Sequence, residues 1–128
     1  MSHAPDNKAG PIPVQWKNDV LAILRRHCKA IEDGKANDDI VTIGRDASRT
    51  WYSTFPNSTF YERNEAMTKA LLAYNVTGIR YDFDYGEAYD FMFEFRDQSM
   101  YGKIALTTSR RAIIICSIHP PDYGDVII

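Results

Sequence analysis

Hydrophobic residues recur at every second position through most of the second half of the chain, the pattern of β-strands with one buried face. Polar turn residues interrupt this alternation at Gly86-Glu87, at Asp97-Gln98 and at Thr108-Ser109-Arg110. Connections this short favour hairpins between successive strands, so the pattern predicts an antiparallel meander. The expected shared faces are Ile79, Tyr81, Phe83 and Tyr85, then Tyr89, Phe91, Phe93 and Phe95, then Met100, Gly102, Ile104 and Leu106, the last set alternating with Tyr101, Lys103, Ala105 and Thr107.

The last predicted strand, from about residue 111 to 118, is apolar on both faces. A strand of this kind is typical of the middle of a sheet or of a position covered on both sides. It ends at His119-Pro120-Pro121, because two prolines cannot continue a hydrogen-bonded ladder.

Helical spacing dominates the first half of the chain. One apolar stripe predicts a helix of about 20 residues that follows Pro13 and stops at Gly34. A second helix is expected from Thr59, which has capping-box spacing with Glu62, to about Tyr74. The stripe of the first helix consists of Trp16, Val20, Leu24, Cys28 and Ile31, and that of the second of Met67, Leu71 and Leu72.

Between these helices, the β-branched run at residues 40–44 predicts a short strand. Residues 45–58 give no clear pattern, apart from an exposed turn at Pro56-Asn57-Ser58. The expected fold is therefore α+β, with two N-terminal helices packed on one face of a four-stranded antiparallel meander sheet. We expect a flexible leader at residues 1–13 and a single α+β domain at residues 14–128.

Composition limits the possible functions. The 128 residues suit one domain, and the formal net charge of −2 argues against whole-molecule attraction to nucleic acid. Neither a signal peptide nor a membrane-spanning stretch is evident, so a cytoplasmic protein with no membrane partner is expected. Cys28 and Cys116 are expected to be free thiols, and the two cysteines and three histidines never cluster at metal-ligand spacing.

Two pairs of polar residues near the end of the chain could carry chemistry. Tyr101 and Lys103 point to the same side of their strand, as do Ser117 and His119 of the next. A two-residue hairpin loop would separate the pairs, whereas a three-residue loop would place them on one face, with Tyr101 opposite Ser117. The sequence leaves both registers open.

Together these residues would suit metal-free cleavage of RNA. The reaction needs a base for the ribose 2′-hydroxyl, a cation for the phosphate charge and an acid for the leaving oxygen. His119 can be the base or the acid near neutral pH, and Lys103 can stabilise the phosphate. Tyr101 can orient a group or donate a proton, and Ser117 can hydrogen-bond a phosphate oxygen. Each of these residues also has an ordinary structural explanation, as a strand terminus, a solvated face or a packed ring.

The segment from Tyr101 to His119 resembles the C-terminal half of small toxin ribonucleases of the barnase, EndoU, colicin and RelE-like grouping. It is most similar to the motility quorum-sensing regulator type, in which a Tyr-x-Lys strand precedes a final strand that ends near a Ser. The resemblance implies that Tyr101, Lys103, Ser117 and His119 are active-site residues. It also implies an enzyme that needs no cofactor, an RNA substrate rather than DNA, and a cognate antitoxin or immunity protein as partner.

Two other regions bear on function. Arg45, Arg49 and Arg63 are interleaved with aromatic residues, a combination that suits single-stranded RNA but also an ordinary packed connection. Acidic residues crowd the expected first hairpin, where they could form a solvated face, an acidic patch for a basic partner or a metal site. These acidic residues are Asp82, Asp84, Glu87 and Asp90.

Two functional hypotheses follow. The first is a metal-independent endoribonuclease of bacterial toxin or effector type, which cleaves RNA by attack of the 2′-hydroxyl. The alternative is a non-catalytic immunity or antitoxin-like module, whose acidic hairpin and aromatic surface would bind another protein.

Overall fold

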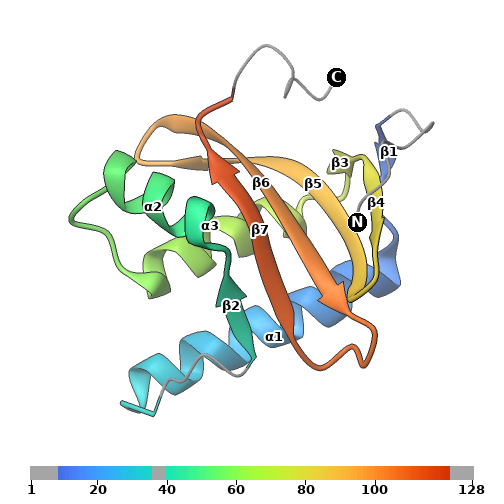
Figure 1. The fold of residues 1–128 in the computed structure, drawn as a ribbon, viewed down its shortest axis with the longest axis horizontal. Coiled ribbons are helices and arrows are strands. Elements are labelled where there is room, and N and C mark those ends of the chain that lie inside the picture. Colours follow the sequence, from blue (N-terminus) through green and yellow to red (C-terminus); the bar gives the residue numbers. More distant parts are fainter. Residues whose placement is uncertain (1–8, 36–39, 122–128) are drawn as a thin grey trace.

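The structure, a computed structural model, describes residues 9–35 and 40–121. Three helices pack against one face of a five-stranded sheet, and two short strands form a second, small sheet (Figure 1). The expected α+β class is confirmed. The helices are α1 (Val14–Glu32), α2 (Arg45–Thr54) and α3 (Phe60–Leu72); the strands are β1 (Gly10–Pro11), β2 (Val41–Ile43), β3 (Thr77–Gly78), β4 (Arg80–Phe83), β5 (Gly86–Phe95), β6 (Gln98–Thr107) and β7 (Ile113–His119).

The large sheet has the strand order β2-β7-β6-β5-β4. Strands β4 to β7 form the expected antiparallel meander. The expectation of a four-stranded, wholly antiparallel sheet was incomplete, because β2 joins the other edge of β7 in parallel, with Thr42 opposite Ile114. Strand β7 is therefore internal to the sheet, which accounts for its apolar residues on both faces.

The core lies between the helices and the aromatic row of β5. Trp16 of α1 meets Tyr89 edge-on with a centroid separation of 5.0 Å, and Trp51 of α2 lies 5.0 Å from Phe95. Burying large rings supplies much of the driving force for folding. The row that the alternation predicted is buried throughout and comprises Tyr89, Phe91, Phe93 and Phe95.

Helix α2 was missing from the two-helix expectation. Its N-cap is Gly44, which supplies no side-chain hydrogen bond, and Ser and Thr weaken the helical pattern of its sequence. Packing overrides this weak propensity, because Ala47 and Trp51, four residues apart, are both buried. The turn expected at residues 56–58 is confirmed at Pro56-Asn57.

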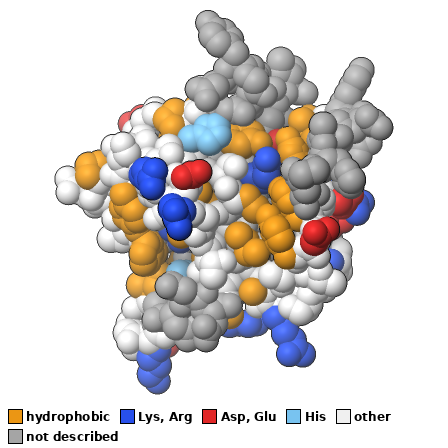
Figure 2. All heavy atoms as spheres, in the orientation of Figure 1, with side chains coloured by type: hydrophobic (Ala, Val, Ile, Leu, Met, Phe, Trp, Pro, Cys, Tyr) orange, Lys and Arg blue, Asp and Glu red, His pale blue; other side chains and the backbone are white. Residues whose placement is uncertain are grey.

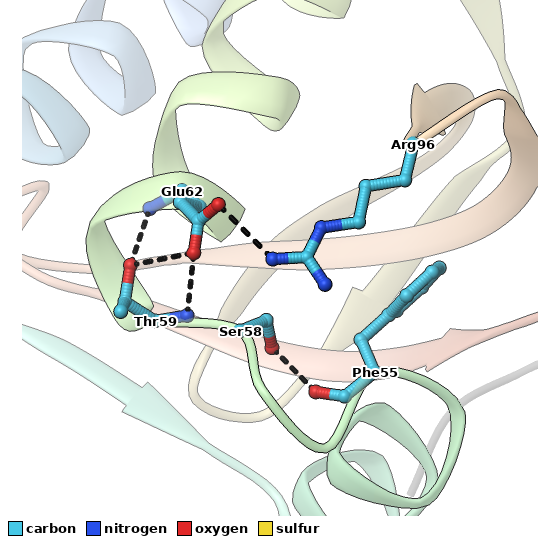
Figure 3. A network of polar contacts seen from close by, with 5 residues as sticks. All are labelled: Phe55, Ser58, Thr59, Glu62 and Arg96. Carbon is cyan, nitrogen blue, oxygen red and sulfur yellow. Dashed lines mark hydrogen bonds and ion pairs between the residues drawn. The ribbon is translucent and has the colours of Figure 1, made fainter.

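Helix α3 begins as its sequence predicts. The Thr59 side chain accepts a hydrogen bond from the Glu62 backbone N–H at 3.1 Å, and Glu62 accepts one from the Thr59 N–H at 3.0 Å (Figure 3). Arg96 reaches Glu62 from the β5–β6 turn at 3.2 Å. That turn lies at Arg96-Asp97, one residue earlier than expected, and both residues adopt a positive φ.

The first hairpin turn also differs from the expectation. It lies at Asp84-Tyr85, and Gly86 already belongs to β5. A Cβ at residue 86 would clash with the backbone oxygen of Leu106. This glycine therefore allows two backbones to approach closely and does not mark the turn.

The folded domain starts before residue 14. Strand β1 pairs with β3, and Ile12 is 3% exposed, so residues 10–12 belong to the domain rather than to a flexible leader. The other residues assigned to the leader, up to residue 8, and residues 122–128 of the expected domain lie outside the described part. Among the described helices, none combines the length and the apolar character that crossing a bilayer requires.

Candidate functional site

A β-bulge in β7 brings the predicted site residues together. Ile104 pairs with Ile115, but Lys103 pairs with Ser117, so Cys116 is an extra residue. Tyr101 then lies opposite His119. Neither of the two hairpin loops considered from the sequence is correct, because the Thr107 N–H binds the Ala112 carbonyl across a longer loop, residues 108–111. The four polar residues nevertheless share one face of the sheet, and they are Tyr101, Lys103, Ser117 and His119.

This face, here called the open face, is opposite the three helices. Gly102 marks the helix side, where a Cβ would meet Phe93 and Met67 of α3. Its neighbours Tyr101 and Lys103 must therefore point the other way. The sheet stands in front of α1 and α3 in Figure 1, and Figure 2 shows the same side, with hydrophobic side chains gathered around a small basic patch over the middle strands. The open face thus combines apolar area with positive charge.

Asp90 of β5 is the polar centre of the open face. Its carboxylate accepts a hydrogen bond from the Ile79 backbone N–H at 2.6 Å. It also accepts one from the Tyr101 hydroxyl at 2.9 Å and one from the Tyr81 hydroxyl at 3.2 Å. Asp90 is only 1% exposed, and three donors offset the cost of burying its charge. Reasoning from the sequence placed Asp90 in the acidic hairpin and missed this role, although its alternation with Tyr89 and Phe91 could have shown that it faces away from the core.

Two further carboxylates of the acidic hairpin are engaged with a cation. Arg80 binds Asp82 at 2.9 Å and Glu87 at 3.1 Å. Within the part of the chain that the structure describes, no three His, Cys, Asp or Glu side chains are grouped to hold a metal ion. The hairpin therefore carries an ion-pair cluster where an acidic patch was considered.

Tyr101 is a buried member of the site. Burial and the adjacent Asp90 carboxylate raise the pKa of its phenol above the ordinary value of 10. Its ring stacks on the His119 imidazole with a centroid separation of 4.9 Å and an interplanar angle of 25°. Of the two roles considered for Tyr101, this arrangement favours orienting a neighbour over donating a proton.

His119 lies at the end of β7, and its Nδ1 is 2.8 Å from the Pro120 carbonyl oxygen. A carbonyl can only accept, so this contact requires a hydrogen on Nδ1. The neutral ring then carries its lone pair on Nε2. This tautomer is the one that a general base needs.

Lys103 supplies the positive charge at the centre of this face. Its Nζ lies 3.9 Å from the centroid of the Tyr81 ring, a cation–π contact. Asp90 lies opposite it on β5 and Ser117 opposite it on β7. Burial raises the pKa of the neighbouring Cys116 thiol, so that sulfur is a poor nucleophile. Both cysteines are free and half-buried.

The three arginines predicted to bind RNA separate into two groups. Arg45 and Arg49 are exposed on α2, which begins beside β7, where the Gly44 N–H binds the Ile115 carbonyl at 3.0 Å. Figure 2 shows basic side chains over α2 on the same side as the open face. Arg63 is only 2% exposed, and its guanidinium lies over the Phe60 ring. This burial in the helical layer does not favour the RNA contact predicted for Arg63, which stays an untested prediction.

Comparison with known proteins adds no relative. No family model matches the chain, and no curated protein or solved structure is significantly similar to it. The functional argument therefore depends on the geometry of the open face.

Proposed function

We propose that the protein is a metal-independent endoribonuclease of bacterial toxin or effector type. The observation that carries the proposal is the convergence of Lys103, Ser117 and His119, supported by Tyr101, on the sheet face opposite the helices. A cation, a hydroxyl and an imidazole on one face are the groups that metal-free phosphodiester transfer uses.

In the proposed reaction, Nε2 of His119 accepts the proton of the ribose 2′-hydroxyl. The oxygen attacks the adjacent phosphorus, the bond from phosphorus to the 5′-oxygen breaks, and the leaving oxygen takes a proton from solvent. Lys103 stabilises the charge that grows on the phosphate oxygens, and the Ser117 hydroxyl donates a hydrogen bond to one of them. The product is a 2′,3′-cyclic phosphate.

Tyr101 has a positioning role in this scheme. Its hydroxyl is held by Asp90 at 2.9 Å, and its ring supports the imidazole of His119. A base held in one orientation avoids the cost of ordering it during the reaction.

Local charge compensates for the net charge of −2. Asp90 is buried beneath hydroxyl donors, and Arg80 engages Asp82 and Glu87. Arg45 and Arg49, beside β7, would hold phosphates that flank the cleaved one. An enzyme of this kind would act on cytoplasmic RNA, and a cognate antitoxin or immunity protein would restrain it.

The test is cleavage of RNA by the purified protein with EDTA present. The variants are Lys103→Ala and His119→Ala, and Lys69→Ala is a matched control because Lys69 is an exposed lysine of α3, on the helix side. We expect the parent and the control to cleave equally. Loss of a general base or a charge-stabilising group typically costs about 10²–10³-fold, so both site variants should be nearly inactive.

Two results would contradict the proposal. One is a parent that cleaves none of several RNAs at high protein concentration, which would favour the protein-binding alternative. The other is cleavage that EDTA abolishes, since the proposed mechanism uses no metal.

A further inference from the structure

Two aromatic rings are stacked at the β4 side of the open face. Phe83 ends β4, and Tyr85 lies in the turn that follows. Their centroids are 5.0 Å apart and their planes differ by 4°. Tyr85 is 44% exposed, so it remains accessible from solvent although its ring already has a stacking partner.

The strands next to these rings carry small residues on the open face. Ala88 and Ala105 lie opposite each other and are fully buried, and Ala88 is paired with Tyr81 on the same face. The hydroxyl of Tyr85 is 3.8 Å from Sγ of Cys116, so the side chain extends from the β4–β5 turn towards β7. The alanines leave room for a flat ring to lie along the sheet.

The stacked pair is continuous with the candidate catalytic site. Tyr81 precedes Phe83 by two residues on the same strand, so both rings lie on the open face. The ammonium of Lys103 lies over the Tyr81 ring. A phosphate bound by Lys103 would therefore lie beside a row of aromatic rings.

We propose that the Phe83–Tyr85 pair is a stacking platform for an unpaired nucleobase of the RNA substrate, next to the phosphate that Lys103 binds. This inference rests on the proposed function and specifies its substrate as single-stranded RNA. A base would continue the offset stack of the two rings, as bases do on the aromatic residues of single-strand-binding sheets. A base within a duplex is stacked on its neighbours and would not reach the platform.

The test measures RNA affinity separately from cleavage. Binding of a fluorescein-labelled single-stranded RNA is followed by anisotropy in the His119→Ala background, with the same strand in a duplex as comparison. Stacking on an aromatic side chain is lost in Tyr85→Ala, so affinity should fall about 5- to 150-fold. Tyr85→Phe keeps the ring and should bind as the parent does, as should Tyr74→Ala, which removes a 93% exposed tyrosine that follows α3.

A further variant guards against loss of folding. Tyr85→Leu keeps an apolar cover over the alanines but presents no flat ring. It should melt close to the parent and still bind RNA as weakly as Tyr85→Ala.

The outcomes separate the two proposals. Equal affinity of the parent, Tyr85→Ala and Tyr85→Leu overturns the platform, even when the parent cleaves RNA normally. A preference for the duplex, or no RNA binding by the parent, overturns it as well. If Tyr85 variants weaken binding of single-stranded RNA but the wild-type chain cleaves none, the platform stands and the proposed catalysis fails.

Discussion

The contact between Tyr101 and Asp90 provides the most direct test of how the open face is built. Tyr101→Phe removes one hydroxyl and keeps the ring that stacks on His119. The lost bond is 2.9 Å long and joins a residue 5% exposed to a carboxylate 1% exposed. Hydrogen bonds to charged groups contribute about 1.5–3 kcal/mol, because a buried carboxylate cannot replace a lost donor with water. We expect Tyr101→Phe to lower the free energy of unfolding by that amount.

The measurement is urea unfolding at pH 7, supported by thermal melts. For a chain of this size, each kcal/mol lowers the melting temperature by about 3–5 °C, so the expected decrease is about 5–15 °C. A double-mutant cycle with Asp90→Asn isolates the contact, and the two changes should couple by more than about 0.5 kcal/mol. A loss of less than about 0.5 kcal/mol in the free energy of unfolding of Tyr101→Phe, or additive effects in the cycle, would refute a hydrogen-bonded centre at Asp90.

The same variant also tests the role of Tyr101 in the proposed reaction. A proton donor typically contributes about 10²–10⁴-fold to rate. The phenol of Tyr101 is held by Asp90 and its pKa is raised, so we expect Tyr101→Phe to lose less than about tenfold in RNA cleavage. A loss of a hundredfold or more in a folded variant would make Tyr101 a catalytic acid.

Two further predictions concern stability. Because the folded-state pKa of Tyr101 is raised above that of the unfolded chain, its contribution is complete below about pH 10 and declines as the pH rises towards the folded value. Above pH 10, the free energy of unfolding measured by urea titration should fall less steeply with pH in Tyr101→Phe than in the parent, by up to about 1.4 kcal/mol per pH unit. Identical pH dependences in the two proteins would argue against a buried phenol. At the start of α3, Thr59→Ala should cost about 1 kcal/mol through loss of the cap, whereas Arg96→Ala should cost less than about 0.5 kcal/mol, because its bridge to Glu62 is exposed. Equal costs in urea unfolding would contradict this ranking.

Features set by local periodicity could be predicted from the sequence. The alternation around Phe91 and Phe93 identified both faces of β5, and the spacing of Thr59 and Glu62 identified the start of α3. In each case the residues that interact are neighbours on the same element or on adjacent elements. A period of two or a capping box records such contacts directly.

Features that depend on contacts between distant parts of the chain could not be predicted from the sequence. The parallel pairing of β2 with β7 joins Thr42 to Ile114 across most of the chain, and nothing in a β-branched run indicates its partner. Helix α2 depends on Trp51 reaching the rings of β5, and the four-residue spacing of Ala47 and Trp51 was the one signal that could have revealed it.

The candidate site was likewise predictable where it follows from local spacing and unpredictable where it follows from strand register. That Tyr101 and Lys103 share a face followed from their spacing, but their alignment with His119 depends on the bulge at Cys116. The residues from Ile113 to Ile118 are almost uniformly apolar, so no contrast in the pattern marks the extra residue. The shift in register at Cys116 is therefore visible only once the pairing of β6 with β7 is known.

The residues of the open face fall into a structural group around the buried Asp90 carboxylate and a group that carries the proposed chemistry. Asp90 connects the chain before β4, through the Ile79 N–H, to β4 and β6, through two tyrosine hydroxyls, so removing it would loosen three segments at once. The groups that donate to Asp90 have a structural role, because they already spend these hydrogen bonds inside the protein. Lys103 and His119 are held differently, Lys103 over the Tyr81 ring, and His119 against the Tyr101 ring and the Pro120 carbonyl. Such contacts orient the two side chains that the proposed reaction uses. Substitutions of Asp90 should therefore affect stability first, and those of Lys103 and His119 should affect cleavage first.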